Sequence, residues 1–267
     1  PHEAIVDKAD GSVVTAVDVA LQVFILTRLQ EVFGAVPTIA EEDLGSIAGK
    51  PAAEAHCRRL LAEWGYDGGE SGIRRALSSG GLEGSTRDVG FAWVLDPIDG
   101  TKSFVRECPF FSTQIALYRA GRMVLGVSSA PAYGELAYAE RGAGAFLADK
   151  RMRVSAVSQI DAAIVSSGNL KTLAAGPRWA RYGELVTRVN RIRGYGDFVH
   201  YHLLARGALD AVIESDVNIL DIAALTVIVE EAGGTFTDLD GGPVTLETTT
   251  VLASNGPLHA PLLAQLR

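Results

Sequence analysis

The chain has 267 residues, of which 48% are hydrophobic and 21% are charged, so it can bury a substantial core and is not intrinsically disordered. Its formal net charge is −8 and it carries no block of lysine or arginine, which argues against binding to a nucleic acid polymer. No apolar run approaches the ~20 residues that a membrane-spanning helix needs, so we expect no membrane insertion.

The cysteines and histidines give no sign of a redox motif or a zinc site. Cys57 and Cys108 form no CxxC pair, and a single disulfide is neither required nor excluded. The five histidines show no spacing typical of a zinc site. With no leader segment of charged and then apolar residues, we expect a cytoplasmic protein. An acidic protein that acts on an anionic substrate needs cations at its site, and metal ions would supply them.

The first two predicted elements carry carboxylates at their ends. Apolar residues at helical spacing predict a helix that opens at Thr15 and continues to about Val32. Thr15 and Asp18 stand three residues apart, as an N-cap and its partner do, and capping alone would explain Asp18. Residues 36–40 predict a short strand that ends on Glu41, Glu42 and Asp43, for which a solvated turn is the alternative to a functional site.

Residues 49–90 have the character of an insertion. The segment 51–64 predicts an amphipathic helix with proline in its first turn. The glycine-rich segment 65–85 predicts a loop or flap.

The most informative segment of the chain is an apolar run, 91–95, followed by Asp96-Pro97-Ile98-Asp99-Gly100-Thr101. The run is typical of a buried strand. Pro97 fixes its own φ and favours an extended Asp96, so both carboxylates are predicted on a rigid turn at the strand end. Carboxylates held so close repel each other unless a cation lies between them. An ordinary turn uses the same residue types, so this stretch alone leaves both interpretations open.

The remaining chain divides into two patterns. Strands predicted at 112–118, 123–128 and 135–139 are separated by short turns, which favours an antiparallel sheet. Beyond about residue 150, predicted strands and helices alternate, which favours an α/β half. We therefore expect an N-terminal half over 1–148 and a C-terminal half over 149–267. The later strands are predicted at 163–166, 209–213 and 250–253, and the later helices at 182–189, 197–206 and 222–232.

Together these motifs resemble the inositol monophosphatase superfamily of Mg²⁺-dependent, lithium-sensitive phosphatases. The family signatures are a Glu-Glu pair, Asp-Pro-Ile/Leu-Asp-Gly-Thr, Val-Thr-x-x-Asp near the start, and Trp-Asp-x-Ala-Ala/Gly before a helix that ends Glu-Ala-Gly-Gly. The resemblance implies an α/β (α+β) fold, the layered α/β/α/β/α sandwich, and a homodimer. Leu220 departs from the family by replacing the usual tryptophan. The matching segments are Glu41-Glu42, Asp96 to Thr101, Val14 to Asp18, and Leu220 to Ala224 continuing to Glu231-Ala232-Gly233-Gly234.

The resemblance also implies the ligands of two or three Mg²⁺ ions. Glu41, Asp96 and the backbone carbonyl of Ile98 would hold the first ion. Asp96, Asp99 and Asp221 would hold the second. For Asp221 the alternative is an N-cap, because it directly precedes the predicted helix 222–232.

Further roles follow from the same resemblance. The implied catalytic residues are Asp18, Glu41 and Thr101, with Thr101 and Asp18 orienting and helping to deprotonate the attacking water. The backbone N–H groups of Gly100 and Thr101 would receive the phosphate. Glu214 matches a position that contacts substrate hydroxyls or amines, and the alternative is a solvated strand end.

The substrate is expected to be a small phosphorylated metabolite, and its class stays open. The segment 193–198 is most similar to histidinol-phosphate phosphatases, which implies an amino-alcohol or polyol phosphate such as histidinol phosphate or inositol phosphate. The insertion and the segment 100–104 are similar to 3′(2′),5′-bisphosphate nucleotidases. We favour the first class, because a carboxylate at Glu214 would repel a second phosphate. A non-catalytic ligand-binding homologue is the remaining hypothesis, and the presence of Glu41, Asp99 and Thr101 argues against it.

Overall fold

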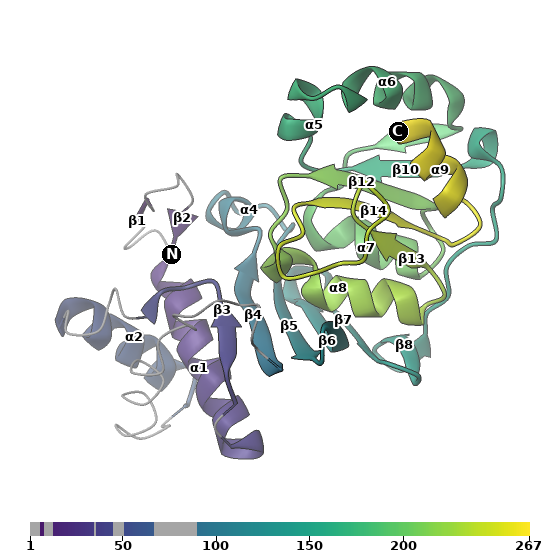
Figure 1. Ribbon diagram of the computed structural model, residues 1–267. Helices are drawn as coiled ribbons and strands as arrows, with labels where there is room; N and C mark the ends of the chain where they lie inside the picture. Colours follow the sequence, from purple (N-terminus) through teal and green to yellow (C-terminus); the bar gives the residue numbers. More distant parts are fainter. Residues whose placement is uncertain (1–5, 8–12, 35, 45–50, 67–89) are drawn as a thin grey trace.

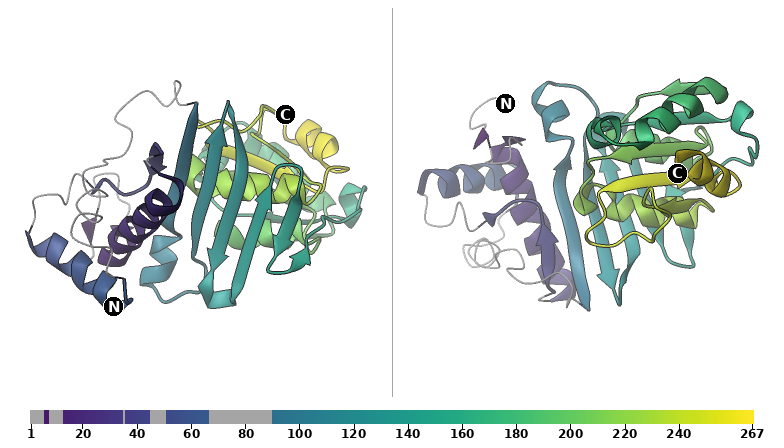
Figure 2. Two further views of the ribbon diagram at one scale, coloured as in Figure 1. Left: turned by 90° about the horizontal axis from the view of Figure 1, so that it is seen from below. Right: turned by 45° about the horizontal axis from the view of Figure 1, so that its top comes forward.

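The computed structural model describes residues 6–7, 13–34, 36–44, 51–66 and 90–267, and within them it forms five alternating layers (Figures 1 and 2). The outer layer is made of α1 (Ala16–Phe33) and α2 (Pro51–Glu63). A seven-stranded sheet follows, and next to it lie α7 (Asp197–Ala205) and α8 (Ile219–Glu231). A five-stranded sheet and then α5 (Lys171–Ala175), α6 (Arg178–Arg188) and α9 (His259–Leu266) complete the α/β/α/β/α order. The predicted sandwich is confirmed, and most of the predicted flap lies outside the described residues.

The seven-stranded sheet has its strands in the order β3-β4-β5-β6-β7-β8-β9. All neighbouring strands are antiparallel except β3 and β4, which are parallel. The predicted meander is confirmed in β5, β6 and β7, while β8 and β9 were not predicted. The bounds are β3 Thr38–Ala40, β4 Phe91–Asp99, β5 Ser112–Arg119, β6 Arg122–Ala130, β7 Glu135–Glu140, β8 Gly144–Leu147 and β9 Lys150–Arg151.

The strand β4 continues through the Asp-Pro-Ile-Asp motif, so the predicted turn after residue 95 is wrong. Asp96 pairs with Gln114 and Asp99 pairs with Ser112, which leaves one extra residue on β4 and defines a β-bulge. Pro97 is tolerated there because a bulge interrupts the ladder that its missing N–H would weaken. The two carboxylates therefore lie on a bulged strand end whose shape is fixed by β5.

Side chains of β4 alternate between two packed faces. Val94 faces the core cluster that contains α7 and α8, whereas Leu95 faces the cluster that contains α1 and α2. Both are at most 1% exposed, as expected for a strand covered on both sides. This double burial makes the end of β4 a rigid platform for Asp96 and Asp99.

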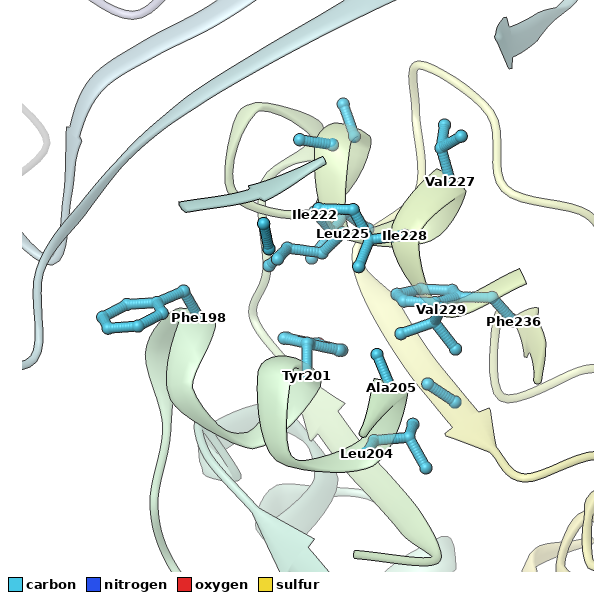
Figure 3. Close-up of a cluster of buried hydrophobic side chains, with 14 of the residues drawn as sticks. Phe198, Tyr201, Leu204, Ala205, Ile222, Leu225, Val227, Ile228, Val229 and Phe236 are labelled. Atoms are coloured by element: carbon cyan, nitrogen blue, oxygen red, sulfur yellow. The ribbon is translucent and has the colours of Figure 1, made fainter. Parts of the chain in front are cut away.

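The helix α8 lies between the two sheets and is apolar around almost its whole circumference (Figure 1). Figure 3 shows its side chains meeting those of α7, and the ring of Tyr201 stacks on Phe236 at 5.5 Å between centroids. The helix has 13 residues, and no helix within the described ranges is long and apolar enough to cross a membrane. It begins at Ile219 rather than 222, with Asn218 as its N-cap, so the predicted N-cap role of Asp221 is wrong.

The five-stranded sheet has the order β11-β10-β12-β14-β13. β10 is parallel to β11 and β12, and β14 is antiparallel to β12 and β13. The predicted alternation of strands and helices is confirmed, but β11, β13, α5 and α9 were not predicted. The strand bounds are β10 Ile164–Ser167, β11 Arg191–Arg193, β12 Ala211–Ser215, β13 Thr235–Thr237 and β14 Thr250–Ser254.

The contact between α8 and β6 leaves no room for a side chain at Gly126. A Cβ added there would lie 2.3 Å from the backbone oxygen of Ala224. We expect Gly126→Ala to force α8 away from the sheet and to lower the free energy of unfolding by roughly 1–3 kcal/mol. Urea unfolding measures this, with Gly183→Ala as the control. Gly183 lies in α6 with no atom within 4 Å of an added Cβ, so that variant should be stabilised by up to about 1 kcal/mol. An unchanged midpoint for Gly126→Ala would contradict the close packing.

Candidate active site

Three carboxylates from the two halves of the chain converge at the bulged end of β4. Asp96 and Asp99 come from β4, and Asp221 comes from the first turn of α8. One carboxylate oxygen of each lies within 4.8 Å of the others. A backbone N–H from Asn218 donates to Asp221 Oδ2 at 2.9 Å and fixes the orientation of that side chain. The structure thus brings together three of the five predicted metal ligands in one buried cluster.

The electrostatics of this cluster are unfavourable when no cation is present. Burial, followed by the charges of Glu41 and Asp99, raises the pKa of Asp96 well above its ordinary value. Burial and then the charge of Asp221 raise the pKa of Asp99 in the same way. Burial also raises the pKa of Asp221 to about 7, although the hydrogen bond from Asn218 opposes it. The cluster therefore retains protons near neutral pH unless a cation replaces them.

Glu41 extends the cluster from the neighbouring strand. It follows β3 directly, and its N–H donates to the carbonyl oxygen of Leu95 at 3.1 Å, which continues the parallel pairing with β4. The next residue, Glu42, is buried, and its backbone exchanges hydrogen bonds of 2.9 and 2.7 Å with the side chain of Gln22. The alternative of a solvated turn is therefore wrong at Glu42, and α1 holds this strand end in place.

Asp18 combines the two roles that the sequence left open. It forms a capping box with Thr15, whose N–H donates to Asp18 Oδ2 at 2.8 Å, so the capping prediction is confirmed. Its other oxygen, Oδ1, lies 3.2 Å from the hydroxyl oxygen of Thr101. Burial raises the pKa of Asp18, and the hydrogen bonds from Thr15 and Thr101 partly offset this. A helix cap and a contact to the centre of the site thus share one carboxylate.

The chain turns sharply between Asp99 and α4 (Thr101–Val105). Gly100 adopts a φ of 83°, and an added Cβ would lie 2.4 Å from the backbone oxygen of Phe110, so only glycine fits. The Thr101 hydroxyl also lies 2.9 Å from the carbonyl oxygen of Ile98. With one hydrogen and two acceptors, Ile98 and Asp18, this hydroxyl keeps a lone pair free for a further partner.

Glu214 is not a solvated strand end, so that alternative is wrong. It lies within β12 and is 3% exposed. Its carboxylate lies 3.0 Å from His200 Nε2 and accepts hydrogen bonds from the hydroxyl of Tyr201 at 2.6 Å and the N–H of Asn169 at 3.1 Å. Burial alone would raise the pKa of Glu214, but His200 and the hydrogen bonds outweigh it and lower the pKa. This carboxylate is therefore held ionised.

A polar pocket of about 270 Å³ opens at Glu214. Asp197, which lines the same pocket, was not among the predicted site residues. It is the first residue of α7 and adopts a φ of 46°, which is uncommon for a residue other than glycine. Burial, and then the charge of Glu214, raises the pKa of Asp197 to about 6. Both carboxylates also act electrostatically on Asp99 and Asp221, so the pocket adjoins the acidic cluster.

The donor set of the cluster fits a hard divalent cation. Asp96 Oδ1 is buried and has no hydrogen-bond partner among the residues that the structure describes. Carboxylate and carbonyl oxygens without histidine or cysteine are the ligands that Mg²⁺ prefers. A cation would coordinate the buried Oδ1 of Asp96 and offset the mutual repulsion of the acids.

The layered fold and the acidic cluster are shared with known phosphatases, and their similarity to this chain identifies its family. A sequence profile of the Inositol monophosphatase family matches residues 2–267, so the chain belongs to this family and is a phosphoric monoester hydrolase. The chain is similar to the histidinol-phosphatase of Mycobacterium tuberculosis, with 42% identity over 68% of this chain and 72% of that protein. It is 34% identical to the inositol-1-monophosphatase of Mesorhizobium japonicum over 70% of this chain and 71% of that protein. The crystal structure of the extragenic suppressor protein suhB from Bartonella henselae matches with a TM-score of 0.76 and 26% identity over 99% of this chain and 89% of that chain.

The raised pKa values predict how the stability of the metal-free protein depends on pH. Folding raises the pKa of Asp99 from its ordinary 3.8, so the folded state binds more protons than the unfolded chain and loses stability as pH rises above about 4. We expect Asp99→Asn to reduce this loss and raise the melting temperature at pH 7 without metal, while Mg²⁺ stabilises the variant less than wild type. Thermal melts from pH 5 to 8 in EDTA and in Mg²⁺ measure both effects. The exposed Asp161→Asn is the charge-matched control, and an Asp99→Asn variant that melts like this control in EDTA would contradict the prediction.

Proposed function

We propose that the protein catalyses the Mg²⁺-dependent hydrolysis of the phosphate monoester of a small amino alcohol, with histidinol phosphate as the first candidate. The observation that carries this proposal is the acidic pocket of Asp197 and Glu214 directly beside the cluster of Asp96, Asp99 and Asp221. One end of this site would hold the phosphate through cations, and the other would hold a positive group of the substrate.

Two or three Mg²⁺ ions would be held by the residues that the family resemblance assigns. Glu41, Asp96 and the Ile98 carbonyl would hold one ion, and Asp96, Asp99 and Asp221 the next, with Asp96 shared. When bound, the ions supply charge neutralisation for the phosphate and activation of the attacking water. The short distances among the carboxylates support this assignment, because the acids repel one another without a cation.

The residues of the chain would orient the phosphate and the water. The backbone N–H groups of Gly100 and Thr101 would donate to phosphate oxygens at the start of α4. The Thr101 hydroxyl donates to Asp18 Oδ1 or to the Ile98 carbonyl, so its lone pair can accept a hydrogen from the attacking water. Asp18 would then hold the hydroxyl in that direction and favour transfer of the proton along this path.

The pocket supports an amino-alcohol phosphate over a bisphosphate. Glu214 is kept ionised by His200 and Tyr201, and Asp197 adds a second carboxylate. Two carboxylates attract an ammonium group and repel a second phosphate. The similar proteins from Mycobacterium tuberculosis and Streptomyces coelicolor are named histidinol-phosphatases. Inositol phosphate is the second candidate, because hydroxyls also donate to carboxylates. A bisphosphate nucleotidase remains the alternative that the insertion suggests.

Other expectations rest on the sequence patterns and on the family resemblance. We propose a homodimer in the cytoplasm whose activity is inhibited by Li⁺, with halves that divide near residue 148. Size-exclusion chromatography with light scattering tests the homodimer, and activity measured in LiCl tests the inhibition by Li⁺.

The direct test of the proposed function is phosphate release from four esters: histidinol phosphate, inositol 1-phosphate, adenosine 3′,5′-bisphosphate and fructose 1,6-bisphosphate. We expect hydrolysis with Mg²⁺, loss of hydrolysis with EDTA, and the highest kcat/KM for histidinol phosphate. Absence of Mg²⁺-dependent release from every ester would favour the non-catalytic homologue. A preference for the nucleotide would overturn the proposed substrate class.

Asp197 gives a sharp test of the substrate class. Asparagine tolerates positive φ and keeps the shape of the side chain, so Asp197→Asn should preserve the fold and remove only the charge. We expect KM for histidinol phosphate to rise roughly tenfold, the effect of about 1.4 kcal/mol of lost attraction, with little change in kcat. Inositol 1-phosphate should be much less affected. Asp216→Asn is the matched control, since Asp216 also has positive φ, at 59°, but does not line the pocket. Equal effects on both esters would contradict recognition of an ammonium group.

Asp18 and Thr101 should act as one unit if they orient the attacking water. We expect Asp18→Asn and Thr101→Ala each to lower kcat by roughly 10²-fold or more, and the double variant to be little worse than either single one. Thr101→Ser keeps the hydroxyl and should retain most of the activity. If Asp18 serves only as a helix cap, Asp18→Asn would instead cost about 1 kcal/mol of stability and leave kcat intact. Steady-state kinetics and urea unfolding of the four variants separate these outcomes.

A further inference from the structure

A chain of buried hydrogen bonds runs from Asp99 through the seven-stranded sheet to α7. The Ser112 hydroxyl donates to Asp99 Oδ2 at 3.2 Å, and Gln114 Nε2 donates to Ser112 Oγ at 2.7 Å and to Ser128 Oγ at 3.0 Å. Ser128 Oγ lies 2.9 Å from Nε2 of His202, which belongs to α7. Every member from Ser112 to His202 is at most 1% exposed. The chain thus links one half of the protein to a predicted metal ligand in the other.

The far end of the chain is fixed by an ion pair near the surface. His202 Nδ1 lies 2.9 Å from Glu135 Oε2, and the Arg206 guanidinium donates to Glu135 Oε1 at 3.1 Å. The hydrogen bond from His202, together with Arg206, lowers the pKa of Glu135. Glu135 is therefore ionised and accepts a hydrogen from His202 Nδ1.

The donors and acceptors leave one direction for the hydrogens. Both hydrogens of the Gln114 amide nitrogen are used on the two serine hydroxyls, so Ser112 accepts from Gln114 and its own hydrogen goes to Asp99. In the tautomer whose hydrogen lies on Nδ1 and is donated to Glu135, His202 accepts at Nε2 from the Ser128 hydroxyl. The orientation of the Ser112 hydroxyl thus depends on Gln114, and that of the Ser128 hydroxyl depends on His202.

We propose that Gln114, Ser128 and His202 are positioning residues that orient the Asp99 carboxylate within the acidic cluster through the Ser112 hydroxyl, which holds Asp99 Oδ2. This inference rests on the proposed role of Asp99 as a metal ligand. Packing alone would not explain a glutamine at position 114. Its carbonyl oxygen is buried without a partner among the described residues, which lowers the stability of the folded protein. An apolar side chain at that sheet position would avoid this cost.

The same helix also serves the opposite end of the site. His200 and Tyr201 of α7 hold Glu214, while His202 of α7 holds the chain that leads to Asp99. α7 thereby sets the acidic pocket and a metal ligand from one rigid element.

The experiment is calorimetric titration of the metal-free protein with MgCl₂ alone, for wild type, Ser112→Ala, Gln114→Met and Ser128→Ala. Losing an outer hydrogen-bond partner of a ligand should weaken Mg²⁺ binding roughly 10- to 100-fold. Thr226→Val is the matched control, since the buried Thr226 hydroxyl donates only to the Ile222 carbonyl within α8. The control should bind Mg²⁺ like wild type. Chain variants that bind Mg²⁺ as tightly as the control would overturn the proposal.

A double variant distinguishes positioning from a general loss of stability. Because Gln114 acts through Ser112, Ser112→Ala combined with Gln114→Met should bind Mg²⁺ no more weakly than Ser112→Ala alone. Additive losses would overturn the proposed chain. In the metal-free protein, ¹⁵N NMR of the His202 imidazole should find its hydrogen on Nδ1, and a hydrogen on Nε2 would also overturn it.

The outcome is separable from that of the proposed function. Wild-type protein that binds Mg²⁺ but releases no phosphate would reject the proposed function, while weaker binding in the chain variants would still support the positioning role. Wild-type protein that binds no Mg²⁺ would reject both.

Discussion

The structure depends on holding like-charged carboxylates within a few ångströms of one another in a buried place. Asp96, Asp99 and Asp221 repel one another there, and burial raises the pKa of all three. The backbone overcomes this repulsion with elements that need no charge: the bulge of β4 fixes the first two, and the capping box of α8 fixes the third. The low polarity that makes the cluster costly also strengthens its attraction for a cation. The acidic cluster thus lowers the stability of the metal-free protein and favours the binding of a cation.

Because Asp221 comes from the other half of the chain, the geometry of the cluster depends on how α8 seats between the sheets. The helix is apolar on nearly all sides, so it has no charged face to present to solvent and is placed by packing on both sides. Figure 3 shows the packing against α7. Gly126 lets its backbone approach β6 directly. A shift of α8 by the width of one methyl group would move Asp221 relative to Asp96. The geometry of the acidic cluster therefore depends on the packing of the core.

The sequence predicts what local spacing controls. Short segments separated by turn residues identified β5 to β7, and Thr15 and Asp18 identified the capping box of α1. The resemblance identified three acids that the structure does bring together. It missed what depends on partners far away in the chain. The extension of β4 past Pro97 needs the register with β5. The start of α8 at Ile219 is a different case, because its N-cap, Asn218, is the adjacent residue and the signal is local. Glu214 could not be distinguished from a solvated strand end, because the residues that hold it lie on α7.

The residues on α7 show where function has been favoured over stability. Asp197 starts the helix at a φ of 46°, a conformation that costs free energy for a residue other than glycine. His200, which contacts Glu214, and His202, which contacts Ser128 and Glu135, are buried on the same helix although each requires a polar partner. A helix selected only for packing would carry apolar side chains at such positions. The strained and buried polar residues of α7 therefore lie where they contact Glu214 and the hydrogen-bond chain that ends at Asp99.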